Sequence, residues 1–147
     1  MDLLSNFAGT LNDLIVEHNL NARTLALALG IDNSTVTRYL NGKRLPSLEN
    51  LVKIANYFNI SSDYLLGLED EISNTNFLPC PPFAERLAFL LNHYKCSSYS
   101  IYNKTDISQV RYYDWKNGVS VPNVDNVVRL AKLLDCSVDF VIGRSKV

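Results

Sequence analysis

The 147-residue sequence contains two similar segments whose matching positions lie 76 residues apart. Aligned without a gap, residues 7–67 and 83–143 are identical at 14 of 61 positions. A period of this length is too long for one unit of a solenoid, and it fits a duplicated small domain of roughly 65 residues. The identical positions are those that a small helical fold would fix, including Phe7/Phe83, Leu11/Leu87, Leu14/Leu90, Ile31/Ile107, Asn41/Asn117, Gly42/Gly118, Pro46/Pro122, Ala55/Ala131, Asp63/Asp139 and Gly67/Gly143.

The repeat predicts an all-α protein with two tandem domains of five short helices each. We expect the first domain to cover residues 1–68, a linker to cover residues 69–82 and the second domain to cover residues 83–147. The linker is acidic and then polar, and it ends in a proline-containing stretch, residues 79–82. Because proline removes backbone donors and stiffens the chain, this end of the linker should be semi-rigid.

Turn and capping residues predict where the helices of the first domain begin and end. Asn21 is a suitable N-cap for a second helix, which should stop at Gly30. Asp32 can cap a third helix that runs to about Leu40, where Asn41 and Gly42 end it. A fourth helix should open at Pro46-Ser47, and Ser61 should cap a last short helix over Asp63–Leu66. The second copy repeats these signals with Asn117-Gly118, Pro122-Asn123, Ser137 and Gly143.

Composition excludes several classes of protein. No apolar run approaches the ~20 residues of a membrane span, and the N-terminus lacks the basic start of a signal peptide, so we expect a cytoplasmic protein without a membrane partner. The cysteines and histidines show no metal-ligand spacing, and we predict no metal and no cofactor. We find no nucleophile–base pair and no phosphate-binding loop, so we do not expect an enzyme.

Charge divides unevenly between the two copies. The net charge of the chain is −1, which by itself does not indicate a nucleic-acid partner. Residues 1–70 carry 5 basic and 8 acidic side chains, a net −3, whereas residues 83–147 carry 9 basic and 6 acidic ones, a net +3. The positions of the charges must therefore decide the function.

Residues 21–44 have the pattern of a helix, a tight turn at Gly30-Ile31-Asp32 and a second helix. The small Ala26 should lie where the two helices cross, and Ile31 and Val36 should point into the joint. The second helix then protrudes from the domain, and such a helix fits the major groove of DNA. Its outward residues would be Asn33, Ser34, Thr37 and Arg38, followed by Asn41, Lys43 and Arg44 near the phosphates.

Both copies resemble the Cro/lambda-repressor-like helix-turn-helix family, also called the XRE family. Residues 34–47 (STVTRYLNGKRLPS) are similar to the recognition helix and following loop of that family, and residues 61–67 (SSDYLLG) to its usual ending. The resemblance implies a five-helix, DNA-binding transcription regulator. It places Asn33, Ser34, Thr37 and Arg38 at base-reading positions and Thr35, Asn41 and Lys43 at backbone-contacting ones. Ala22 stands where the family often has a glutamine that contacts a phosphate.

The second copy departs from this pattern. Tyr102 replaces Ala26 and should alter the helix crossing unless it swings outward, while Asp106 replaces Gly30 and is compatible with a surviving turn. Asp114 replaces Arg38, and Val119 and Ser120 replace the loop cations Lys43 and Arg44. A second set of DNA readers would be Gln109, Arg111 and Tyr113.

Two hypotheses follow. The first is a sequence-specific regulator of transcription, most simply a repressor, that reads double-stranded DNA with the helix around Asn33–Leu40; its second domain would serve as a homodimer contact, a partner-binding surface or a second reader. The alternative is a protein-binding adaptor, antirepressor-like or antitoxin-like, in which DNA contact is secondary. The altered second copy and the acidic balance of residues 1–70 motivate the alternative.

Overall fold

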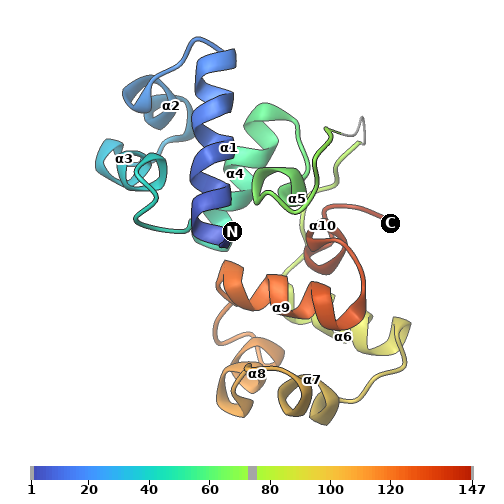
Figure 1. The fold of residues 1–147 in the computed structure, drawn as a ribbon. Helices are drawn as coiled ribbons and strands as arrows, with labels where there is room; N and C mark the ends of the chain where they lie inside the picture. Colours follow the sequence, from blue (N-terminus) through green and yellow to red (C-terminus); the bar gives the residue numbers. More distant parts are fainter. Residues whose placement is uncertain (1, 73–75, 147) are drawn as a thin grey trace. The chain divides into compact units, whose positions relative to one another are not determined.

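The computed structural model describes residues 2–72 and 76–146, and these residues contain ten α-helices and no β-strand. The chain divides into two compact units, Met1–Thr75 and Asn76–Val147 (Figure 1). The predicted all-α class and the five helices of each copy are confirmed. None of the helices in the described residues is long and apolar enough to cross a membrane.

The first unit contains helices α1 to α5. Their bounds are α1 Leu3–Glu17, α2 Ala22–Leu29, α3 Asn33–Leu40, α4 Leu48–Phe58 and α5 Ser62–Leu65. Phe7, Leu11 and Leu14 of α1 are buried in the core of the unit, as are Leu25 of α2 and Leu51 of α4, because apolar side chains three, four and seven apart share one helix face. In Figure 1, α3 lies beside α2 and at the periphery of the unit.

The second unit contains helices α6 to α10. Their bounds are α6 Phe83–His93, α7 Ser98–Lys104, α8 Gln109–Lys116, α9 Val124–Leu134 and α10 Val138–Ile142. Its core includes Leu87, Ile101, Tyr112, Trp115 and Val127. Large aromatic side chains thus fill positions that smaller ones occupy in the first unit, since Tyr112 matches Val36.

Most of the predicted caps are present. The side chain of Ser47 accepts a hydrogen bond from the N–H of Asn50, and that of Ser61 accepts one from Tyr64. Asn123 and Ser137 cap α9 and α10 in the same way. The last helix of the first unit begins at Ser62 and ends at Leu65, one residue earlier at each end than expected.

Part of the predicted linker packs on the second unit. The N–H of Leu78 donates to the carbonyl of Arg144 at 2.9 Å. The Arg144 guanidinium lies 3.8 Å from the ring centroid of Phe77 and forms a buried salt bridge with Asp139 at 3.1 Å. Residues 76–82 are therefore anchored to the unit that follows them. The middle of the predicted linker, residues 73–75, lies outside the described residues.

Candidate nucleic-acid interface

The turn between α2 and α3 is built by local backbone chemistry. Asn21 and Thr24 form a reciprocal capping box at the start of α2, with both hydrogen bonds at 2.9 Å. At the other end Gly30 adopts a left-handed conformation with φ of +67°, which glycine reaches without a steric cost. The N–H of Ile31 then donates to the carbonyl of Ala26 at 3.0 Å. This geometry sends the chain directly into α3.

Close packing fixes α3 against α2 and α1. Ala26 and Val36 are buried at the crossing of α2 and α3, as predicted, whereas Ile31 is half-buried. The small side chain at Ala26 allows close approach, and these two helices form one of the most tightly packed pairs in the unit. On its inner side α3 buries Tyr39, whose ring meets Phe7 edge-on at 5.6 Å between centroids. The opposite side of α3 is exposed to solvent.

Two asparagines tie α3 to neighbouring helices, and sequence reasoning missed both. The side-chain amide of Asn12 donates to the carbonyls of Ala8 and Leu40, each at 2.8 Å. The amide of Asn50 donates to the hydroxyl of Tyr39 at 3.0 Å. Asn50 could have been found from the sequence, because this position is asparagine in both copies. No such indication exists for Asn12, since the second copy has alanine there.

The residues predicted to read bases gather on the free side of α3. Asn33, Ser34 and Arg38 are exposed, and Thr37 is half-buried. The Thr37 hydroxyl donates to the carbonyl of Asn33 at 2.9 Å, which orients its methyl group and its lone pairs. Asp32 occupies the N-cap position, but its carboxylate accepts no bond from the helix backbone. The position of Asp32 is therefore as expected, but the capping hydrogen bond of its side chain is not formed; the carboxylate accepts from the Ser34 hydroxyl at 3.5 Å.

The residues predicted to contact the DNA backbone lie on α3 and directly after it. Gly42 is left-handed, with φ of +69°, and the N–H of Lys43 donates to the carbonyl of Arg38 at 3.0 Å, so the chain folds back along the end of α3. Asn41, Lys43 and Arg44 are exposed and Thr35 is half-buried. Neither Lys43 nor Arg44 forms an ion pair within the described residues. These two cations are thus available to an anionic partner.

The corresponding turn of the second unit, between α7 and α8, has a different geometry. When the two copies are aligned, α7 ends one residue earlier than α2, and the backbone of Thr105 is extended, with φ of −132° and ψ of 175°. The Thr105 hydroxyl donates to the carbonyl of Ile101 at 2.6 Å and accepts from the N–H of Ile107 at 3.1 Å. Asp106 does not take the left-handed conformation of Gly30. The glycine-type turn therefore does not survive in this copy.

A tyrosine cluster separates α7 from α8. Tyr102 is half-buried, and its ring centroid lies 5.8 Å from that of Tyr112 and 6.1 Å from that of Tyr113. Unlike α2 and α3, α7 and α8 are not a closely packed pair. Burial raises the pKa of Tyr112, although its short hydrogen bond to the Ser98 hydroxyl, at 2.6 Å, opposes the shift. Tyr102 thus alters the crossing, as its size predicts.

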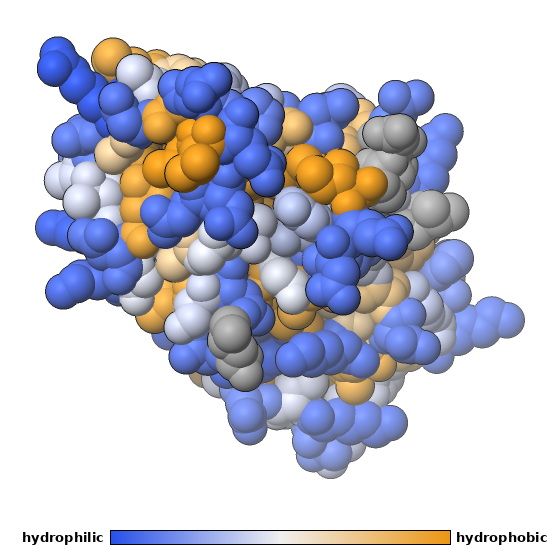
Figure 2. All heavy atoms as spheres, turned by 45° about the horizontal axis from the view of Figure 1, so that its top comes forward, coloured by the Kyte–Doolittle hydropathy of each residue, from blue (hydrophilic) through white to orange (hydrophobic). Residues whose placement is uncertain are grey.

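The outer face of α8 differs in chemistry from that of α3. Gln109 and Arg111 are exposed, but Tyr113 is half-buried in the tyrosine cluster. Val110 is 72% exposed where the first copy has Ser34, and Val119 is 72% exposed where it has Lys43. In the view of Figure 2, the exposed hydrophobic side chains form separate patches that hydrophilic side chains surround. Of these two helices, α3 therefore has the more uniformly polar exposed face, formed by Asn33, Ser34 and Arg38.

The turn, the crossing and the exposed polar face of α3 define a DNA-binding protein of the helix-turn-helix class. The family model described as Helix-turn-helix matches residues 11–65 and 99–141. The chain belongs to this family of Cro/lambda-repressor-like, XRE-type proteins, and both of its copies contribute to the match.

Two curated relatives are similar to parts of the chain. The HTH-type transcriptional regulator ImmR of Bacillus subtilis is 42% identical over 48 residues, which are 33% of this chain and 37% of that protein. The uncharacterized HTH-type transcriptional regulator YobD of Bacillus subtilis is 36% identical over 61 residues, which are 42% of this chain and 54% of that protein. The matched stretches thus span about half or less of these relatives.

A solved structure is also similar. It is the crystal structure of a transcriptional regulator from Listeria innocua, with 30% sequence identity and a TM-score of 0.41. The similarity covers 66% of this chain and 83% of that one.

Proposed function

We propose that the chain is a sequence-specific regulator of transcription, most simply a repressor, that inserts α3 into the major groove of double-stranded DNA. The observation that carries this proposal is the two-sided character of α3. Val36 and Tyr39 are buried and held by neighbouring helices, while Asn33, Ser34 and Arg38 project into solvent. A fixed helix that presents exposed hydrogen-bonding side chains at its outer face suits the reading of base edges.

Each outward side chain has a definable chemical role. An asparagine such as Asn33 can pair bidentately with adenine, and an arginine such as Arg38 can do so with guanine. Ser34 is less selective, and the methyl group of Thr37 can contact a thymine methyl. The backbone would be held by Thr35, Asn41, Lys43 and Arg44, which fix register without reading sequence.

The second unit is proposed to pair two copies of the chain. A single helix-turn-helix reads few bases, and such proteins commonly combine two readers on half-sites about one DNA turn, roughly 34 Å, apart. The exposed Val110, Val119 and Val121 of the second unit face solvent where the first copy has Ser34, Lys43 and Leu45. Apolar side chains favour a protein contact over a phosphate contact. The use of Gln109, Arg111 and Tyr113 as a second reader is less supported, because Tyr113 is engaged in the tyrosine cluster.

A protein-binding adaptor, antirepressor-like or antitoxin-like, is the second candidate. The same exposed valines of the second unit favour it, as does the net −3 of residues 1–70. In that case the apolar face would hold a different protein, and α3 would contribute little to binding.

Selection of duplexes from a random pool by the full-length chain tests the proposal. A regulator that reads DNA with α3 should enrich a defined motif, and two readers should produce two half-sites about 10 base pairs apart. The mass of the free chain in solution, measured in parallel, gives the number of copies. If no motif is enriched and duplex binding is no tighter than binding to heparin, the adaptor becomes the better account.

A further inference from the structure

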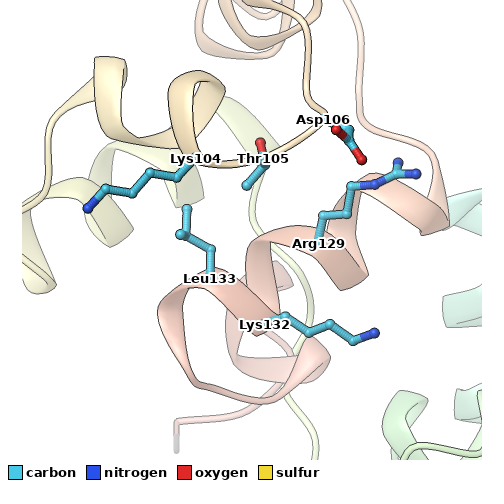
Figure 3. A pocket seen from close by; sticks show the side chains of 6 residues that line it. All are labelled: Lys104, Thr105, Asp106, Arg129, Lys132 and Leu133. Carbon is cyan, nitrogen blue, oxygen red and sulfur yellow. The ribbon is translucent and has the colours of Figure 1, made fainter.

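A group of basic side chains lies in the second unit outside the α8 face. Lys104 stands at the end of α7, and Arg129 and Lys132 stand on α9. Together with Thr105, Asp106 and Leu133 they line an open hollow of about 320 Å³ (Figure 3). We call Lys104, Arg129 and Lys132 the α7–α9 basic cluster.

The α7–α9 basic cluster is specific to the second copy. The matching residues of the first copy are Ala28, Lys53 and Asn56, so only one of the three is a cation there. That cation, Lys53, lies 3.7 Å from the carboxylate of Glu49. The shared helical scaffold therefore does not require the cluster. The second copy carries these charges and lacks both cations of the loop after the recognition-type helix, since Val119 and Ser120 stand in the places of Lys43 and Arg44.

The charges of the cluster are only partly balanced. None of the three cations forms an ion pair within 4.0 Å in the part of the chain that the structure describes. Figure 3 shows the Asp106 carboxylate on the side of Arg129, which leaves a net charge of about +2 around the hollow. Arg129 is also held in place, because its guanidinium donates at 2.8 Å to the side-chain oxygen of Asn126, a residue only 6% exposed.

The directions of the cationic groups indicate the form of the ligand. In Figure 3 the ammonium group of Lys104 points away from that of Lys132, so the charged ends spread from the hollow and do not converge on one point. A compact anion is held by donors that converge on it, as in bidentate recognition of phosphate or carboxylate. Spread cations suit a polymer with regularly spaced negative charges, and duplex DNA is such a polymer.

We propose that the α7–α9 basic cluster binds phosphates of duplex DNA, so that the second unit contacts DNA through α7 and α9 and not through α8. This inference rests on the proposed function, since it concerns a second contact of the same DNA-binding chain. The contact is independent of base sequence, because lysine and arginine at the phosphates fix position without reading bases. It leaves the exposed Val110, Val119 and Val121 available for pairing of two copies.

The salt dependence of binding tests this proposal with full-length protein. The variant combines Lys104→Gln with Lys132→Gln, which keeps polar, helix-compatible side chains and leaves the Arg129–Asn126 contact intact. Affinity for a selected duplex and for a scrambled duplex is measured by fluorescence anisotropy at several KCl concentrations. Each lost phosphate contact flattens the plot of log affinity against log salt by about 0.9, so the variant should lower the slope by about 2 on both duplexes. The preference for the selected duplex should stay unchanged.

A matched variant separates local contact from overall charge. Lys53→Gln with Lys146→Gln removes the same charge at two exposed lysines outside the cluster, and it should leave the slope near that of the original chain. An equal flattening in both variants, or no flattening in the cluster variant, would show that the cluster does not touch DNA. Adding Arg129→Gln should flatten the slope further, and circular dichroism melting checks that each variant is folded.

Two further results are informative. If inorganic phosphate alone, at constant ionic strength, shifts the amide signals of Lys104 and Lys132 with a Kd below about 1 mM, the hollow binds a compact anion and the proposal is wrong. If the unaltered chain binds no duplex at any salt concentration, the proposed function itself fails. Binding with a normal slope that the cluster variant does not change rejects only the present inference.

Discussion

The side-chain amide of Asn12 donates a hydrogen bond to the main-chain carbonyl of Leu40 at 2.8 Å, and this bond joins α1 to the end of α3. The same amide donates to the carbonyl of Ala8 within α1. One side chain thus satisfies a carbonyl at a helix end, where the helix itself supplies no partner. In the second unit the matching residue is Ala88, so α8 has no equivalent tie.

Replacing Asn12 with alanine should therefore loosen α3 within a folded first unit. A net hydrogen bond contributes about 1 kcal/mol, and both bonds of Asn12 are partly solvated, so we expect a loss of about 1 kcal/mol in the free energy of unfolding. DNA affinity should fall as well, because α3 is no longer held at its end. Urea denaturation and gel-shift titration measure the two effects. Val16→Ala, on the exposed surface of the same helix, is the control and should change neither.

Arg38→Ala should relax the base preference of the chain. The exposed guanidinium of Arg38 is the strongest candidate for a bidentate contact to guanine, and its loss should cost about 1–3 kcal/mol of discrimination at one base pair. Titration against a panel of duplexes with single base substitutions locates that position. Lys53→Ala, on α4, should leave every preference intact. An unchanged profile for Arg38→Ala would mean that α3 does not read bases through this residue.

Lys43→Ala should weaken binding to all duplexes to a similar degree. Lys43 follows the left-handed Gly42 and forms no ion pair in the described part of the chain, so it is free to contact a phosphate. Its removal should flatten the salt slope by about 0.9 and leave base preference unchanged. Equilibrium binding at several salt concentrations provides both quantities. A selective loss on one sequence would instead place Lys43 at a base.

Lysine at Val110 and Val119 should prevent pairing of two chains. Both side chains are exposed on the α8 side of the second unit, and burial of charge in an apolar contact is unfavourable. Sedimentation equilibrium should show a dimer for the unaltered chain and a monomer for Val110→Lys with Val119→Lys. Val16→Lys, at a valine of similar exposure on α1, is the control and should remain dimeric. A monomeric unaltered chain would rule out pairing through this face.

Two glycines of the first unit should respond to alanine in opposite directions. Gly30 is left-handed, so Gly30→Ala should destabilise the first unit by about 1 kcal/mol through backbone strain. Gly9 lies inside α1, where an added Cβ would meet no atom within 4 Å apart from its chain neighbours and the backbone of its own helix, and Gly9→Ala should stabilise the unit by about 0.5–1 kcal/mol. Thermal melts of the two variants measure both signs. A stabilising Gly30→Ala would contradict the turn geometry.

Much of the fold could be predicted from short segments of sequence. Gly30, Gly42, Ser47 and Ser61 mark helix ends by interactions within three or four residues, and each ends or caps a helix as expected. Asp32 occupies the N-cap position of α3 as predicted, but its carboxylate accepts from the Ser34 hydroxyl and does not form the expected bond to the helix backbone. The contacts to bases, and the assignment of DNA reading to the first unit and of pairing to the second, stay predictions.

Taken alone, the repeated sequence determined that this protein has two helical units and that α3 carries a polar outer face. These properties depend on periodicity, capping and turn residues, which act over a few neighbouring positions. Only the tertiary structure placed Asn12 beside Leu40 and brought Lys104 to the same hollow as Arg129 and Lys132. Those relationships join residues from different helices, and how closely two helices approach is decided by the packing of side chains such as Ala26 and Tyr102, so no local pattern encodes them.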